Sequence, residues 1–111
     1  MEFFIDSAEI SDIQKAASMG LVDGVTTNPT LIKKAGKDHE ATIREISGLV
    51  DGPISVETIG LTAEEMLKEA EEYVTWGKNI VIKVVMTSEG MKAVKQLTDK
   101  GVNTNVTLVF S

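Results

Sequence analysis

Short runs of β-branched and aliphatic residues alternate along this chain with longer stretches in which apolar residues recur every three or four positions. The short runs predict strands at residues 3–6, 24–27, 54–59, 79–87 and 104–110. The longer stretches predict amphipathic helices at about 7–20, 29–52 with a break at Gly36, 62–76 and 87–101. This alternation is typical of βαβ units and predicts a parallel α/β sheet with right-handed crossovers.

Local signals support these boundaries. Asn28 followed by proline is typical of a helix N-cap with proline at the first helical position. Thr62, with Glu65 three residues later, is a capping box. Side chains alternate along a strand, so Ser55 and Glu57 are expected on one face of the third strand and its apolar residues on the other.

The fourth predicted strand contains one lysine, Lys83, within an otherwise apolar run. In one interpretation its stem covers apolar surface on an edge strand and its ammonium reaches water, which requires no chemistry. In the other, apolar surroundings favour the uncharged amine, which then acts as a nucleophile of the Schiff-base type. The strand considered alone favours the first interpretation.

Composition narrows the class of protein. The chain has 111 residues, a net charge of -6 and 42% hydrophobic residues, which predicts one soluble, mildly acidic domain over residues 1–111. Nucleic acid is not an expected partner, because the lysines are dispersed among glutamates rather than clustered. Met1 leads directly into a predicted strand without a signal or membrane segment, so we expect a cytoplasmic protein with no membrane partner.

Thiol and metal chemistry have no support in the sequence. There is no cysteine, and the one histidine, His39, lies in a polar run without neighbouring residues of metal-ligand type. We therefore predict no metal site and no cofactor, and interpret His39 as an ordinary surface residue.

Polar residues recur at the carboxyl ends of the predicted strands, where ligands bind in parallel βα arrays. Taken singly, each has a structural explanation, such as a helix cap, a β-forming threonine, or a neutralising pair between Glu57 and Lys83 on adjacent strands. Five successive strands with a polar group at the same end are harder to explain by packing and predict a site around Lys83. The members of this set are Asp6, Thr26, Asn28, Glu57, Lys83, Asn105 and Thr107.

Four segments resemble the small transaldolases and the related fructose-6-phosphate aldolases, and the similarity runs collinearly over the whole chain. The Gly-Val-Thr-Thr-Asn-Pro and Asn-Val-Thr-Leu-Val-Phe-Ser sequences are the most distinctive. The segments are residues 4–8, 23–32, 80–90 and 104–111.

The resemblance implies a class I, metal-independent (β/α)₈ TIM barrel that moves a dihydroxyacetone unit between sugar phosphates in the pentose phosphate pathway. By motif, Lys83 matches the lysine that condenses with the ketose carbonyl, and Asp6 matches the acid/base group for the sugar hydroxyl. Glu57 and Thr107 match the pair that holds a proton-shuttling water. Asn28 and Asn105 match residues that hold substrate hydroxyls, and Thr26 is a further expected substrate-binding residue beside Asn28.

Length is the main departure from the family. A (β/α)₈ barrel typically takes ~250 residues, whereas this sequence predicts about five strands and four main βα units, the first half of a TIM barrel. The family's phosphate-binding serine and arginines would lie in the other half. A smaller departure is Val85, where the small transaldolases usually have proline.

Several alternatives remain at this level. A half-barrel has open edges, so we expect a homo-oligomer, either paired half-barrels or a sheet flattened into a doubly wound, flavodoxin-like layer. The chain is then either a transaldolase-like enzyme with weak or absent turnover, or a non-catalytic, self-associating scaffold. A phosphate-binding module at helix N-termini ranks last, because no Gly-rich phosphate loop is present.

Overall fold

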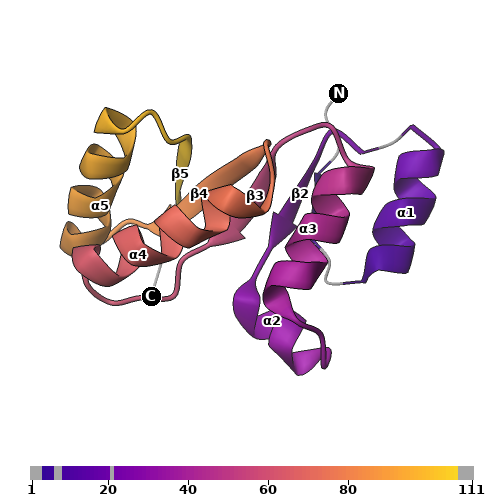
Figure 1. Cartoon of the computed structure of the whole chain (residues 1–111), viewed down its shortest axis with the longest axis horizontal. Coiled ribbons are helices and arrows are strands. Elements are labelled where there is room, and N and C mark those ends of the chain that lie inside the picture. The colour runs from indigo at the N-terminus through magenta and orange to yellow at the C-terminus, as the bar shows by residue number, and fades with distance from the viewer. Residues whose placement is uncertain (1–3, 7–8, 21, 108–111) are drawn as a thin grey trace.

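The structure, a computed structural model, describes residues 4–6, 9–20 and 22–107. Strands and helices alternate along this part of the chain, with two helices between the second and third strands (Figure 1). The strands are β1 (Phe4–Asp6), β2 (Gly24–Thr27), β3 (Ile54–Glu57), β4 (Ile80–Val85) and β5 (Thr104–Thr107). The helices are α1 (Ile10–Ser18), α2 (Pro29–Lys34), α3 (His39–Leu49), α4 (Ala63–Tyr73), the 3₁₀ turn η1 (Val74–Trp76) and α5 (Ser88–Asp99).

The described strands form one parallel sheet in the order β1-β2-β3-β4-β5. Each strand therefore lies beside its predecessor in the sequence, as in the wall of a (β/α)₈ barrel. A flavodoxin-like sheet has the order 2-1-3-4-5, so that alternative is wrong. The predicted α/β class is confirmed, and the sheet is consistent with half of a TIM barrel.

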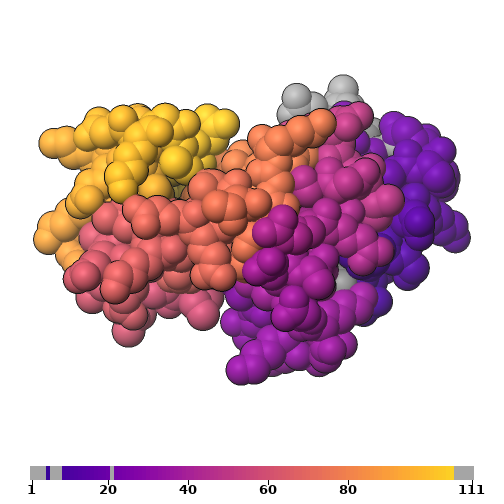
Figure 2. Space-filling view, viewed as in Figure 1, coloured from indigo at the N-terminus to yellow at the C-terminus, as the bar shows by residue number. Residues whose placement is uncertain are grey.

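The two faces of the sheet differ in burial. In β4, Ile80, Ile82 and Val84 are buried, whereas the alternating residues between them are only half-buried. Strand β3 repeats the pattern with a buried face formed by Ile54 and Val56. The buried face packs against the helices, which follow one another across the molecule in sequence order (Figure 1). The space-filling view accordingly changes from indigo to yellow across the molecule (Figure 2). The other face, which we call the barrel-side face, carries Thr26, Glu57, Lys83 and Asn105.

Asn79 holds together the amino ends of β3 and β4. Its side-chain amide donates hydrogen bonds to the carbonyl oxygens of Val50 (2.8 Å) and Gly52 (2.7 Å), and its Oδ1 accepts one from the Ser47 hydroxyl (2.8 Å). Its own carbonyl accepts from the Ile54 amide at 2.9 Å. Because every polar group of this side chain is used, the connection before β3 is held against the start of β4.

Side-chain N-caps begin both α4 and α5. Thr62 and Glu65 make the reciprocal bonds of a capping box at α4, and the Thr87 hydroxyl accepts from the Gly90 amide at 2.9 Å at the start of α5. These caps satisfy backbone donors that a helix leaves unpaired and define where each strand-to-helix loop ends.

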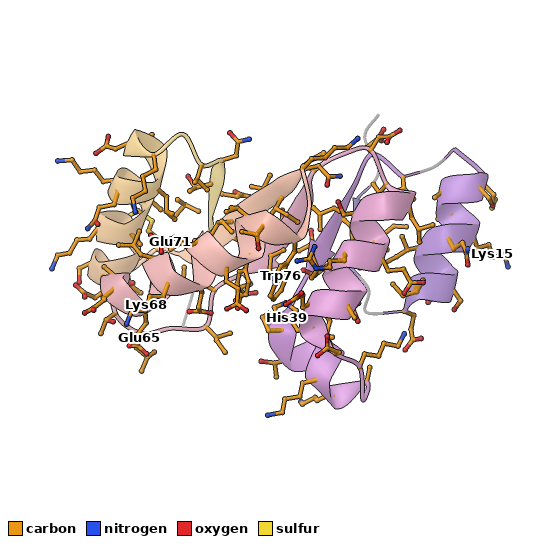
Figure 3. The ribbon with its side chains drawn as sticks, in the orientation of Figure 1. Lys15, His39, Glu65, Lys68, Glu71 and Trp76 are labelled. Carbon is orange, nitrogen blue, oxygen red and sulfur yellow. The ribbon has the colours of Figure 1, made fainter. Side chains whose placement is uncertain are left out.

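His39 is not an ordinary surface residue, and that interpretation is wrong. Its ring packs edge-on against Tyr73 (centroids 5.2 Å apart) and Trp76 (4.9 Å), between α3 and the end of α4 (Figure 3). Its Nε2 atom is buried without a hydrogen-bond partner among the described residues. Removal from water disfavours the imidazolium, so burial lowers the pKa of His39, while Asp38, Glu72 and Glu69 oppose the shift.

This lowered pKa predicts a pH-dependent stability. Near pH 6.5 and below, the unfolded chain binds a proton at His39 that the folded chain resists, so the free energy of unfolding should fall as pH decreases from 7.5 to 5.5. His39→Phe keeps an aromatic ring and should flatten this slope, measured by urea unfolding at several pH values. The chain has one histidine, so no other imidazole contributes. An equal slope in both proteins would contradict the assignment.

Candidate active site

Strand register aligns the predicted site residues in rows across the barrel-side face. Glu57 of β3 lies directly opposite Lys83 of β4, and Lys83 lies opposite Asn105 of β5. Neighbouring strands are ~4.8 Å apart, so these three residues form one continuous row with the lysine in its centre. The sequence-based expectation that they share one end of the sheet is met by this backbone placement.

Asp6 and Thr26 belong to a second row, nearer the amino ends of β3 and β4. Asp6 pairs with Thr26, which pairs in turn with Ser55, two residues before Glu57. Asp6 is therefore three strands from Lys83 along the sheet, and only the curvature of a barrel would bring them together. Thr107 pairs with Val85, beyond the Lys83 row. The side chains of Asp6 and Thr107 lie outside the described residues, so the structure places only their backbone.

Asn28 links a helix terminus to Glu57. As the predicted N-cap of α2, its Oδ1 accepts hydrogen bonds from the amides of Thr30 (2.8 Å) and Leu31 (3.2 Å). Its amide nitrogen is consequently turned away from the helix and donates to Glu57 Oε2 at 3.1 Å. The cap thus determines which end of the amide meets the carboxylate, and a flipped amide would place oxygen against oxygen.

A pocket of about 320 Å³ opens beyond the carboxyl ends of β2, β3 and β4. Asn28 and Glu57 supply polar groups to its wall, and Val85 and Met66 supply apolar ones. Lys83 does not line the pocket. It lies on the barrel-side face two residues before Val85, so the pocket reaches the lysine row at Glu57 and not at Lys83 itself.

Lys83 is half-buried and flanked on its face by Val81 and Val85. None of the ion pairs between described residues involves Lys83 or Glu57, so the neutralising pair considered from the sequence is not formed. The hydrogen bonds at this position are made by the Lys83 carbonyl, which accepts from the Thr58 amide at 3.1 Å. The arrangement therefore fixes the lysine backbone while its amine stays without a charged partner in the described structure.

The loop between β3 and α4 also borders the site, although its residues were not predicted to do so. Residues 58–61 line the pocket directly after Glu57, and Ile59 and Leu61 are 61% and 84% exposed there. The signal that could have identified this loop is Gly60 between two large apolar residues, immediately before the capping box.

Neither a metal site nor a membrane-spanning helix is found in the part of the chain that the structure describes. No group of three or more His, Cys, Asp or Glu side chains there could hold a metal ion. No helix there is long and apolar enough to span a bilayer.

Asn28 both caps α2 and donates to Glu57, and two substitutions that keep an N-cap residue separate these contacts. Asn28→Asp and Asn28→Ser both keep an acceptor for α2, but aspartate also brings a second carboxylate against Glu57. At pH 7, Asn28→Asp should be less stable than Asn28→Ser by about 1 kcal/mol, and the gap should shrink in 1 M salt. Urea unfolding measures both values. Equal stabilities at low salt would show that the Asn28–Glu57 contact does not form.

Comparison with known proteins shows which family the chain belongs to. The family described as Transaldolase/Fructose-6-phosphate aldolase matches residues 3–111. Over all 111 residues, the chain is 56% identical to a probable transaldolase of Geobacter metallireducens and 55% identical to one of Methanococcus maripaludis, covering 52% of each. It is 52% identical to probable transaldolase 2 of Listeria monocytogenes and covers 51% of it. The chain thus spans about half the length of these relatives, and it belongs to the transaldolase/fructose-6-phosphate aldolase family.

Proposed function

We propose that this chain carries the amine and proton-transfer groups of a class I, Schiff-base transaldolase or aldolase acting on ketose sugar phosphates. The observation that supports this most directly is the register of β3 and β4, in which Glu57 lies opposite Lys83. Asn28, which donates to the Glu57 carboxylate, holds that group at the mouth of the pocket. A lysine beside an oriented carboxylate is the arrangement that imine formation requires.

In the proposed reaction, the uncharged Lys83 amine attacks the ketose carbonyl carbon and forms a carbinolamine. Glu57 and Thr107 hold a water that moves a proton to the departing hydroxyl, which leaves as water and gives the protonated imine. The imine then accepts the electron pair of the adjacent carbon–carbon bond when that bond breaks, so the bound fragment becomes an enamine. No metal ion takes part in these steps.

Asp6 is the proposed base in the cleavage step. It takes the proton of the hydroxyl on the carbon beyond the breaking bond, and that carbon leaves as an aldehyde. Asn28, Thr26 and Asn105 are the proposed partners of the hydroxyl groups on the bound ketose. Because the chain spans about half the length of its relatives, we propose weak turnover for this chain alone.

The proposed unit is a single partial TIM-barrel domain over residues 1–111, working in the cytoplasm in sugar-phosphate metabolism. Because the chain spans about half of its relatives, the phosphate of the substrate is proposed to bind groups outside these residues.

Borohydride trapping tests the role of Lys83. Incubation with fructose 6-phosphate or dihydroxyacetone, reduction and peptide mass spectrometry should place the adduct on Lys83. Lys83→Met should abolish it, whereas Lys95→Met, at an exposed position on α5, should leave it unchanged. An unmodified Lys83 under conditions that label a full-length relative would overturn the proposal.

A second candidate function is self-association of a non-catalytic half-barrel. It is favoured by the barrel-side face, against which none of the described helices packs, and by Val106 on the opposite face of β5, which is 36% exposed. In a chain of the relatives' length, further βα units would cover these surfaces; in this chain, a second copy is the proposed cover.

Sedimentation velocity tests this candidate. We expect a dimer or larger species at tens of micromolar, weakened by Val106→Lys because a charge would face the covered surface of β5. Gln96→Lys, at an exposed position on α5, is the matched control and should not change the distribution. A monodisperse monomer would rule out self-association, and an oligomer without an adduct on Lys83 would favour this candidate over catalysis.

A further inference from the structure

The loop between β3 and α4 forms a wall of the pocket, although its two large apolar side chains are exposed. Residues 58–61 follow Glu57 directly and line the pocket, yet Ile59 and Leu61 are among the exposed large apolar residues. Burial of these side chains therefore does not hold the loop in place. A loop with few buried contacts needs another anchor to keep one conformation.

The anchor is the carboxylate of Glu69, in the second turn of α4. Its Oε2 accepts a hydrogen bond from the Ile59 amide at 2.9 Å, and its Oε1 accepts one from the Gly60 amide at 2.6 Å. Two consecutive backbone N–H groups thus meet both oxygens of one half-buried carboxylate. Hydrogen bonds to an ionised acceptor are about twice as strong as those between neutral groups.

Gly60 allows the loop to approach this carboxylate. A Cβ atom at this position would lie 2.6 Å from Glu69 Oε1 and 2.7 Å from Glu65 Cβ. The glutamate tip could move away, but Glu65 Cβ is fixed to the helix backbone. Any larger residue at position 60 would therefore displace the loop from α4.

Aromatic packing holds the carboxylate in turn. The Tyr73 hydroxyl donates to Glu69 Oε2 at 3.0 Å, and the Tyr73 ring packs against His39 and Trp76. Burial, followed by the Glu69 charge, raises the pKa of the Tyr73 phenol, so it remains a donor at neutral pH. A continuous set of contacts thus runs from the start of α3 through Tyr73 and Glu69 to the pocket wall.

We propose that Glu69 is a positioning residue of the active site, which acts through the Ile59 and Gly60 amides to fix the pocket wall and the carboxylate of Glu57. The effect on Glu57 is transmitted through Thr58, the one residue between Glu57 and the anchored amides, whose own amide donates to the Lys83 carbonyl. The catalytic part of this inference rests on the proposed function; the anchoring of the loop does not.

Amide hydrogen exchange by NMR tests the anchor. Glu69→Gln replaces one acceptor oxygen with an NH₂ group, so at least one of the two loop amides loses its partner. Exchange at Ile59 or Gly60 should become about tenfold faster or more, as expected for loss of a charge-assisted bond. Glu71→Gln removes the same charge from an exposed position on α4 and should change these amides less than twofold (Figure 3). Unchanged exchange in Glu69→Gln would overturn the anchor.

Gly60→Ala provides an independent variant, because it displaces the loop while leaving the carboxylate intact. It should speed exchange at Ile59 and at residue 60 as Glu69→Gln does, and slow exchange there would also contradict the anchor. Thermal unfolding of each variant separates local loosening from global destabilisation.

The rate of borohydride-trapped adduct formation on Lys83 tests the positioning role. With Glu69→Gln, the limiting rate at saturating ketose should fall about tenfold, while the half-saturating concentration should change less than threefold, because misplacement of Glu57 slows proton transfer. Faster loop exchange with an unchanged limiting rate would reduce Glu69 to a structural role. Absence of any adduct in the unmodified chain would refute the proposed function instead, and the exchange data would still decide the anchor.

Discussion

The parallel pairing of β3 with β4 is the interaction on which the rest of the molecule depends. It places Ile54 and Val56 beside Ile80 and Ile82, which form the centre of the buried face against the helices. The same register sets Glu57 opposite Lys83 on the other face. A slip of one residue would turn the polar side chain of the shifted strand into the core and its apolar row out of it. The core and the candidate site are therefore consequences of one alignment.

Much of this arrangement is readable from the sequence, because it depends on local patterns. Period-two alternation predicts which side of β3 carries Glu57, and the Asn28–Pro29 pair predicts where α2 begins. Parallel βα order then places Lys83 and Asn105 at the same end of the sheet. Periodicity does not predict how far along its strand each residue lies relative to the residues of the neighbouring strand. The stagger that puts Asp6 and Thr26 one row below Glu57 is set by strand register, for which the sequence carries no local signal.

The residues that the sequence did not reveal act through contacts between distant segments. His39 lies in a polar run, and only the packing of α3 against the end of α4 brings its ring to Tyr73 and Trp76. Glu69 is one of several glutamates on α4, and nothing in its local sequence separates it from Glu71, which pairs with Lys100 at the surface. Its distinct role arises from the loop that folds back onto the helix.

The sequential strand order also bears on how the chain acquires its structure during synthesis. Every strand of the described sheet pairs with the one that preceded it from the ribosome, so each new βα unit finds its docking edge already formed. Contacts that join neighbouring segments close short loops and form quickly, whereas pairings across a whole chain are slow. Growth of the sheet can thus proceed by addition at one edge, from the amino terminus onward. The Glu57–Lys83–Asn105 row would then assemble in the order in which β3, β4 and β5 are synthesised.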